Sequence, residues 1–482
     1  MLVLINANRL SPPIAPLGLE YVAGAARAAG VETAVLDLNL ADDATRSAVP
    51  LGGISPRLVG ISLRNVDDCF WPSATSFLPA CAALVAKVRA QTDAAIAIGG
   101  VGFSAFGSRL MDLLGADYGV RGDGERALPE LYQALTLSTG VHDLPERLSK
   151  VDGLIWSKNG KWIENAPAFK DDQPWPRPRD LVDNRRYFAL GGQIGVETKR
   201  GCPRKCIYCA DPVAKGTRVR VRDPELVADE CASLLAQGID VLHLCDGEFN
   251  IPRAHASAVC EALIRRGLGE RLRYYAYLAV RPFDRELARL MRRSGCVGIN
   301  FTGDSASDPM LLSYRAAHRK QHLEETVRLC RDAGITCMVD LLLGGPGETP
   351  ESVAETIESM KRIAPDCVGA GLGMRLYPDT LVTQLLQSEH ASAPVPGILR
   401  KYSGPLDLAQ PTFYIAPALG ARPAALVREL IAGDPRFFPP IDASNVSTSD
   451  DHNYSDNDAL SRAIRDGARG AYWDILRQMR HD

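Results

Sequence analysis

The chain has 482 residues, of which 46% are hydrophobic and 23% charged, and its formal net charge is −3. That length exceeds one ordinary hydrophobic core, so we expect two or three domains. The nearly neutral charge, without a basic run, disfavours nucleic acid as a partner. No stretch approaches the roughly 18 apolar residues that a membrane-spanning helix needs, so the sequence predicts no membrane span.

The N-terminal stretch, MLVLINANRL, predicts a first β-strand. It lacks the basic start and small-residue cleavage site of a signal peptide, which favours a cytoplasmic location. The 12 cysteines are mostly scattered through apolar segments. In a reducing compartment such cysteines are small buried hydrophobic residues rather than disulfides.

Strand-like and helix-like segments alternate through residues 1–140, which predicts a parallel sheet with helices on both faces. We therefore expect a doubly wound, Rossmann-like α/β domain whose ligand crevice lies beyond the carboxyl ends of the strands. The expected strand ends carry residues 6–8, 64–67, 99–100 and 122–125.

Residues 141–190 predict a hairpin around Lys158-Asn159-Gly160 followed by a proline-rich linker. Six strand–helix units follow in residues 191–385, which predicts a partial (β/α)6 barrel with its chemistry at the carboxyl ends of the strands. Residues 386–482 predict a mostly helical C-terminal segment that ends in one amphipathic helix over 458–479.

Cys202, Cys206 and Cys209 form a Cys-x3-Cys-x2-Cys loop directly after the first barrel strand. Structural zinc commonly takes two paired ligand groups, and His243 and His255 do not supply a second pair. Three thiolates on one short loop favour a 4Fe–4S cluster with one open iron. Zinc and a purely structural role remain the alternatives.

With Tyr208 as its aromatic residue, this loop has the Cys-x3-Cys-x-aromatic-Cys signature and resembles the radical S-adenosylmethionine (SAM) enzymes over about residues 190–380. The resemblance implies that the open iron is chelated by the amino and carboxylate groups of SAM. It also implies that an electron from the cluster yields a 5′-deoxyadenosyl radical, which makes the three cysteines catalytic.

The same resemblance implies further SAM contacts. Asp246-Gly247-Glu248 stands in the place of the family's Gly-Gly-Glu motif, and either carboxylate is a candidate for the methionine ammonium. The candidate SAM-binding residues are Tyr208, Asp246, Glu248, Asp304, Ser305, Gly345 and Met374. The alternatives are an exposed strand-end turn, a tight glycine turn before a helix capped by Thr349, and ordinary core packing.

The N-terminal domain resembles the cobalamin-binding subclass of these enzymes, on the segments at its strand ends. The candidate cobalamin-binding residues are Asn8, Arg64, Asn65, Val66, Gly99, Gly100, Gly122, Asp123 and Glu125. Alternatively, Arg64 is a surface arginine, Asp123 and Glu125 cap a helix, and the whole domain only docks on the barrel.

The chain has no histidine before His142, so the Asp-x-His-x-x-Gly motif of many cobalamin domains is missing. Cobalamin would therefore bind without a histidine on its lower face, which suits methyl transfer through cobalt. We expect Arg64 and Asn65 to lie under the corrin.

The C-terminal segment is similar to that of cobalamin-dependent amino-acid methylases, including tryptophan methylases. Tyr454, Asn457 and Tyr472 are candidates for lining a substrate pocket. The alternative is a capped helix that docks with its aromatic residues inward.

These resemblances imply a methyltransferase that passes a methyl group from SAM, via methylcobalamin, to a carbon of a small metabolite or natural-product intermediate, with tryptophan as one candidate. A reducing donor such as flavodoxin or ferredoxin would be its partner. Two alternatives remain: a cobalamin-dependent radical SAM enzyme of a non-methylating cyclisation, rearrangement or oxidation, and a zinc-stabilised binding module.

Overall fold

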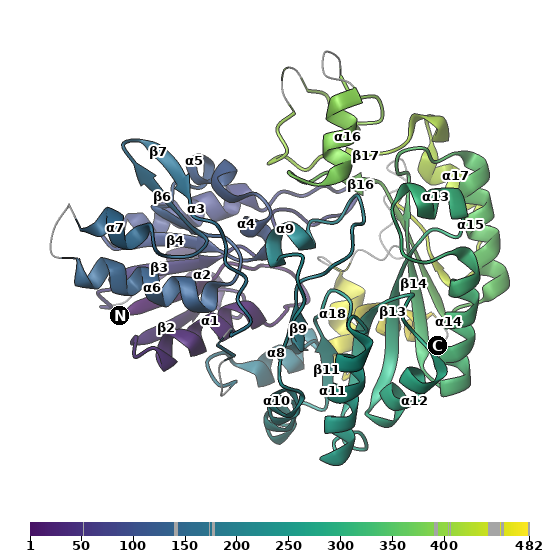
Figure 1. Ribbon diagram of the computed structural model, residues 1–482, viewed down its shortest axis with the longest axis horizontal. Coiled ribbons are helices and arrows are strands. Elements are labelled where there is room, and N and C mark those ends of the chain that lie inside the picture. The colour runs from purple at the N-terminus through teal and green to yellow at the C-terminus, as the bar shows by residue number, and fades with distance from the viewer. Residues whose placement is uncertain are drawn as a thin grey trace.

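The structure is a computed structural model that describes residues 1–480 except 52, 139–142, 173, 176–178, 390–393, 403, 405, 442–453 and 455–456. Two α/β lobes lie side by side, and the N-terminus belongs to one and the C-terminal helices to the other (Figure 1). The expected fold class, a doubly wound domain followed by a partial barrel and a helical C-terminal segment, is confirmed.

The first lobe is built on a seven-stranded sheet with the order β2-β1-β3-β4-β5-β6-β7. Strands β1 to β5 are parallel, and β6 and β7 are antiparallel additions at one edge. The strands are Leu2–Asn6 (β1), Thr33–Asp37 (β2), Leu58–Ser62 (β3), Ala95–Gly99 (β4), Tyr118–Val120 (β5), Leu154–Lys158 (β6) and Lys161–Glu164 (β7).

Helices cover both faces of this sheet because alternate strand residues point to opposite sides. Leu2 and Leu4 pack with α1 and α6, whereas Val3 and Ile5 pack with α3 and α5. The helices of this lobe are Leu17–Ala28 (α1), Asp43–Ala48 (α2), Leu78–Arg89 (α3), Val101–Ser104 (α4), Gly107–Leu110 (η1), Met111–Leu114 (α5), Gly124–Leu137 (α6) and Leu144–Leu148 (α7).

The predicted hairpin is confirmed, with Asn159 and Gly160 forming its two-residue turn at φ of 52° and 73°. These left-handed angles match the twist of antiparallel strands. Because β6 also pairs with β5, the first sheet continues past residue 140 to Glu164.

The second lobe holds a curved sheet with the order β18-β15-β14-β13-β12-β11-β8, in which all neighbours are parallel. Each of the six expected strand segments contains a strand, and β18 adds one that the sequence did not predict. The strands are Gly195–Val196 (β8), Val241–Leu244 (β11), Arg273–Ala279 (β12), Cys296–Asp304 (β13), Thr336–Leu343 (β14), Cys367–Leu372 (β15) and Phe437–Phe438 (β18).

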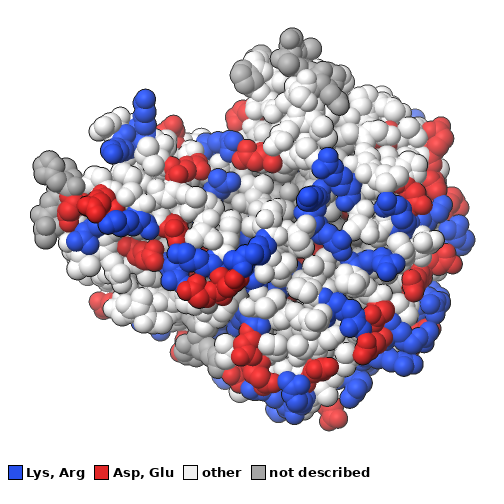
Figure 2. Space-filling view, viewed as in Figure 1, with Lys and Arg blue, Asp and Glu red and all other residues white. Residues whose placement is uncertain are grey.

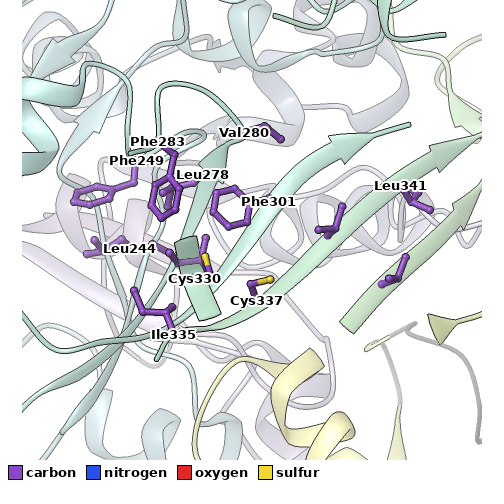
Figure 3. Packing of buried hydrophobic residues seen from close by; sticks show 14 of the residues in the cluster. Leu244, Phe249, Leu278, Val280, Phe283, Phe301, Cys330, Ile335, Cys337 and Leu341 are labelled. Carbon is purple, nitrogen blue, oxygen red and sulfur yellow. The ribbon is translucent and has the colours of Figure 1, made fainter. Parts of the chain in front are cut away.

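Helices pack on the outside of this sheet. Figure 3 shows Leu244, Leu278 and Phe301 among the side chains that form the core beneath them. The helices of this part of the chain, on the sheet and beside it, are Asn184–Gly191 (α8), Asp211–Lys215 (α9), Pro224–Ala236 (α10), Arg253–Arg265 (α11), Arg285–Arg293 (α12), Asp308–Ser313 (α13), Lys320–Ala333 (α14), Pro350–Ile363 (α15), Leu381–Glu389 (α16), Pro417–Leu419 (η2) and Pro423–Ile431 (α17). The short strand pairs are Lys199–Arg200 (β9) with Arg220–Val221 (β10), and Met374–Arg375 (β16) with Phe413–Tyr414 (β17).

The inner face of the barrel is filled at one end by the C-terminal helices Asp458–Arg465 (α18) and Tyr472–Met479 (α19), yellow in Figure 1. Met338 and Cys367 on the strands pack against Trp473 and Leu460 on these helices. The prediction of one continuous helix over 458–479 is wrong. Gly467 and Gly470 adopt φ of 108° and 150° between the two helices, and a Cβ at Gly470 would lie 2.7 Å from the Tyr275 hydroxyl.

Within the described ranges, no helix combines the length and apolar character that crossing a bilayer requires. On the face seen in Figure 2, basic and acidic side chains are interspersed rather than gathered by sign.

Candidate functional site

A cavity of about 490 Å³ lies where the carboxyl ends of β1, β3, β4 and β5 face the inner side of the second sheet. Arg64 and Asn65 also line an adjoining cavity of about 330 Å³. The two adjoining spaces give room for a large ring with an appended tail. The predicted cobalamin residues on the larger cavity are Asn8, Arg64, Asn65, Gly99, Gly100, Gly122, Asp123 and Glu125.

Val66, the remaining predicted cobalamin residue, is 2% exposed and packs in the core of the first lobe. The structure therefore does not favour it as a ligand contact. Gly100 has an internal role, since its φ is 104° and a Cβ would lie 2.6 Å from the Leu63 carbonyl oxygen. A glycine there lets the end of β4 approach the loop after β3.

Asp123 and Glu125 are held by arginines from the second lobe. Arg200 in β9 pairs with Glu125 at 2.6 Å and with Asp123 at 3.1 Å, and Arg220 also pairs with Asp123. Asp123 precedes α6, but its side chain makes no capping hydrogen bond. These carboxylates therefore join the two lobes, a role that the spacing of residues along the chain did not indicate.

The cysteine loop runs from β9 to α9 and is held by hydrogen bonds at several points. The backbone N–H of Cys202 donates to Gly216, and that of Ile207 donates to Tyr314. The Tyr208 hydroxyl donates to Asp304 at 2.6 Å. The loop is therefore fixed to the end of β13 as well as to its own flanks.

The three thiols fit a cluster better than a single ion. Among the residues that the structure describes, no three His, Cys, Asp or Glu side chains converge on one metal position. Burial raises the pKa of all three thiols, that of Cys206 to about 12, and Cys202 raises it further. A bound cation would favour the thiolate forms of these thiols, and a cluster with its several irons supplies that charge.

The two candidate carboxylates for the SAM ammonium have different surroundings. Asp246 accepts hydrogen bonds from the Thr198 N–H at 2.7 Å, the Thr198 hydroxyl at 2.5 Å and the Lys199 N–H at 3.2 Å. Glu248 accepts from Thr302 at 3.1 Å, and its second oxygen is buried without a partner among the described residues. Burial raises the pKa of Glu248 to about 7. Glu248 is thus the carboxylate that remains available to a ligand cation.

The other predicted SAM residues are already engaged by the protein. Asp304 accepts from Tyr208, and Ser305 is fully buried with its hydroxyl 2.9 Å from that of Thr356. A Cβ at Gly345 would lie 2.2 Å from the Tyr314 hydroxyl, so packing alone requires this glycine. Met374 is 1% exposed in the core. The alternative of a glycine turn before a capped helix is confirmed, since Thr349 accepts from the Ser352 N–H at the start of α15.

The three candidate substrate-pocket residues of the C-terminal segment also make contacts within the protein. Tyr454 and Tyr472 pack edge to face at 5.5 Å, and the Tyr472 hydroxyl donates to the Gly191 carbonyl. The Asn457 side chain accepts from the Leu460 N–H and caps α18. Asn457 therefore has the structural role that the capped-helix alternative predicted.

The sequence reasoning missed a set of polar residues on the inner face of the barrel. His243, Cys245 and Tyr277 line the large cavity. Burial lowers the pKa of His243 to about 4, which keeps the imidazole neutral. Asn300 and Asp340 lie further along the inner face and share a hydrogen bond. In the sequence, these inner-face residues are marked only as polar residues within strands that are otherwise apolar, at the positions that alternate with the core residues.

Comparison with known proteins supports the two-lobe arrangement. A radical SAM superfamily model matches residues 196–360, and a B12 binding domain model matches residues 4–132. The tryptophan 2-C-methyltransferase of Streptomyces laurentii is 28% identical over 98% of this chain and 94% of its own.

Among solved structures, the radical S-adenosylmethionine methyltransferase TsrM from Kitasatospora setae, with tryptophan substrate and aza-SAM bound, aligns with a TM-score of 0.90 at 31% identity. The alignment covers 100% of this chain and 97% of that one. TsrM has also been solved with cobalamin and a [4Fe-4S] cluster bound. The cobalamin-dependent SAM radical enzyme OxsB aligns with a TM-score of 0.71 at 15% identity over 86% of this chain, which shows a shared fold.

Proposed function

The chain belongs to the cobalamin-dependent radical S-adenosylmethionine methyltransferases, and on that basis we propose that it methylates C2 of tryptophan or of a closely related indole amino acid. The proposal rests on the named activity of the Streptomyces laurentii relative and on the tryptophan substrate of TsrM. Family membership favours methylation over the non-methylating alternatives, and it disfavours the zinc-stabilised binding module.

The observation that carries the proposal is the shared cavity between the lobes. Arg64 from the first lobe and Cys245 and Tyr277 from the barrel line one space. Methyl transfer requires the donor and the acceptor carbon to meet in a fixed geometry away from water. A space enclosed by both lobes provides that meeting point.

The residues present fit three cofactors. When bound, the cluster, SAM and cobalamin together supply an activated methyl group. Cys202, Cys206 and Cys209 would hold the cluster, Glu248 would accept from the SAM ammonium, and the strand ends of the first lobe would hold the corrin. The protein's own contribution is positioning and the exclusion of water.

The test is anaerobic reconstitution with iron, sulfide, cobalamin and methyl-labelled SAM, followed by incubation with tryptophan and a chemical reductant. We expect one labelled methyl group on tryptophan, placed at C2 by NMR. Labelled cobalamin with unlabelled tryptophan would reject tryptophan as the substrate. Formation of 5′-deoxyadenosine in step with methylation would indicate radical transfer, and methylation without it would indicate polar transfer.

A further inference from the structure

Asp340 lies in the middle of β14 and points to the inner face of the barrel. Its strand neighbours Val339 and Leu341 pack in the core beneath the outer helices, so alternation places Asp340 on the opposite side. In the strand register, Asp340 lies opposite Thr302 on β13 and Gly369 on β15. A carboxylate therefore faces the interior of the barrel.

In the described part of the chain, this carboxylate has one hydrogen-bond donor and no basic partner. Asn300 donates to Oδ2 at 2.7 Å, and the described residues provide no ion pair to Asp340. Burial raises its pKa to about 6 because the apolar surroundings disfavour the charge. The side chain still keeps part of its surface exposed, and that surface faces the barrel interior. A cationic group entering there would compensate the charge.

Two tyrosines lie in the neighbourhood of the carboxylate. Burial raises the pKa of Tyr277 to about 12, and the charge of Asp340 contributes to that rise. Asp340 also raises the pKa of Tyr454. Tyr277 lines the cavity between the lobes and lies opposite Asn300 in the strand register. Because Asn300 donates to Asp340, the carboxylate lies close to the proposed reaction space.

Gly369 shapes the site from the other side. A Cβ at this position would lie 2.2 Å from Asp340 Oδ1, so the glycine lets the carboxylate rest against the backbone of β15. The result is a carboxylate that one amide orients and that rests against the backbone of the neighbouring strand. This suits a compact ammonium group, which has three donors and a positive charge.

We propose that Asp340, oriented by Asn300, binds the ammonium group of the amino-acid substrate. The inference rests on the proposed function for the indole part of that substrate. It adds that the enzyme selects a free amino acid by its ammonium group, at a site on β14 that is separate from the carboxylate that would meet SAM.

The test compares tryptophan with 3-(indol-3-yl)propionate, which lacks only the amino group, in equilibrium binding to the anaerobic holoprotein. Wild-type protein should bind tryptophan more tightly than it binds the propionate. Asp340→Asn, which keeps the shape and the Asn300 contact, should lose about 10- to 100-fold in tryptophan affinity and change its affinity for the propionate less than about 2-fold. The matched control is Asp332→Asn. Asp332 is a surface carboxylate that pairs with Arg285 and Arg328, and this variant should bind tryptophan like wild type.

Equal tryptophan affinity of wild-type protein and a folded Asp340→Asn variant, with its fold checked by circular dichroism, would overturn the inference. Wild-type protein that binds neither ligand would instead reject tryptophan as the substrate. The comparison would then be repeated with the amino acid that is methylated and its desamino analogue. A preference for the ammonium form that disappears in Asp340→Asn supports the inference there, and the absence of such a preference overturns it.

Discussion

Arg200 in β9 and Glu125 at the start of α6 form a buried ion pair at 2.6 Å that joins the two lobes. Arg200 stands two residues before Cys202, and Glu125 lines the cavity proposed for cobalamin. This contact therefore fixes the cysteine loop relative to the first lobe. Burial raises the pKa of Glu125, and the charge of Arg200 opposes that rise.

Replacing Arg200 should destabilise the protein strongly. Arg200→Met removes a buried cation that pairs with Glu125, Asp123 and Glu197, and breaking a buried pair in this way costs about 3–5 kcal/mol. The free energy of unfolding from urea denaturation measures the loss. Arg273→Met removes an exposed pair with Asp240 and should cost less than about 1 kcal/mol. Equal losses in the two variants would contradict the assigned role.

The cysteine loop should be the site of iron binding. A triple Cys202→Ala, Cys206→Ala, Cys209→Ala variant should purify anaerobically without iron, sulfide or brown colour, because a cluster needs its thiolates. Elemental analysis and the visible spectrum provide the measurement. Cys231→Ala, in the core side of α10, should retain the cluster. Zinc at the loop of the wild-type protein would contradict the assignment.

Glu248 and Asp246 should respond differently to loss of charge. Glu248→Gln should weaken SAM binding by about 10- to 100-fold, because it removes a charged acceptor for the ligand ammonium. Asp246→Asn should mainly lower the free energy of unfolding, since Asp246 accepts from Thr198 and Lys199. Calorimetric SAM titration and urea denaturation of both variants separate the roles. SAM affinity lost only in Asp246→Asn would reverse the assignment.

Asp340 should lower stability at neutral pH in the absence of substrate. Its pKa of about 6 in the folded protein exceeds the value near 4 of an unfolded aspartate. The folded state therefore holds the proton more tightly, and this contribution to stability declines as the pH rises from about 4 to about 6. Asp340→Asn should be more stable than wild type by about 1–3 kcal/mol at about pH 7.5 and nearly equal at about pH 4. A less stable variant at pH 7.5 would contradict this reading.

Tryptophan binding should have the opposite pH dependence to stability. The ammonium group needs the ionised form of Asp340, so affinity should rise as the pH increases through about 6. Glu248 and Asp304, whose pKa values burial raises to about 7, also titrate nearby. The part of the pH dependence of tryptophan affinity that is lost in Asp340→Asn is due to the titration of Asp340. An identical pH profile in the variant would exclude its role.

Much of the architecture could be predicted because it depends on local patterns. Alternating apolar segments determine strands and helices, and they place residues such as Arg64 and Gly99 at the same edge of a sheet. The spacing of Cys202, Cys206 and Cys209 predicts a cluster loop for the same reason, since all three ligands lie within one short segment of the chain. The amphipathic pattern predicts one terminal helix because it continues across Gly467 and Gly470, whereas the positive φ of these two glycines ends one helix before the next begins.

The amino-acid sequence by itself determined the two α/β lobes, the thiolate loop and the absence of a cobalt-binding histidine from the first 141 residues. Only the tertiary structure decided how each polar side chain is used. Asp246 is engaged by Thr198, whereas no described residue brings a cation to Asp340, because hydrogen-bond and charge partners come from strands that are distant in the chain. Strand periodicity is a local property, whereas the neutralisation of a buried charge depends on what the fold brings beside it.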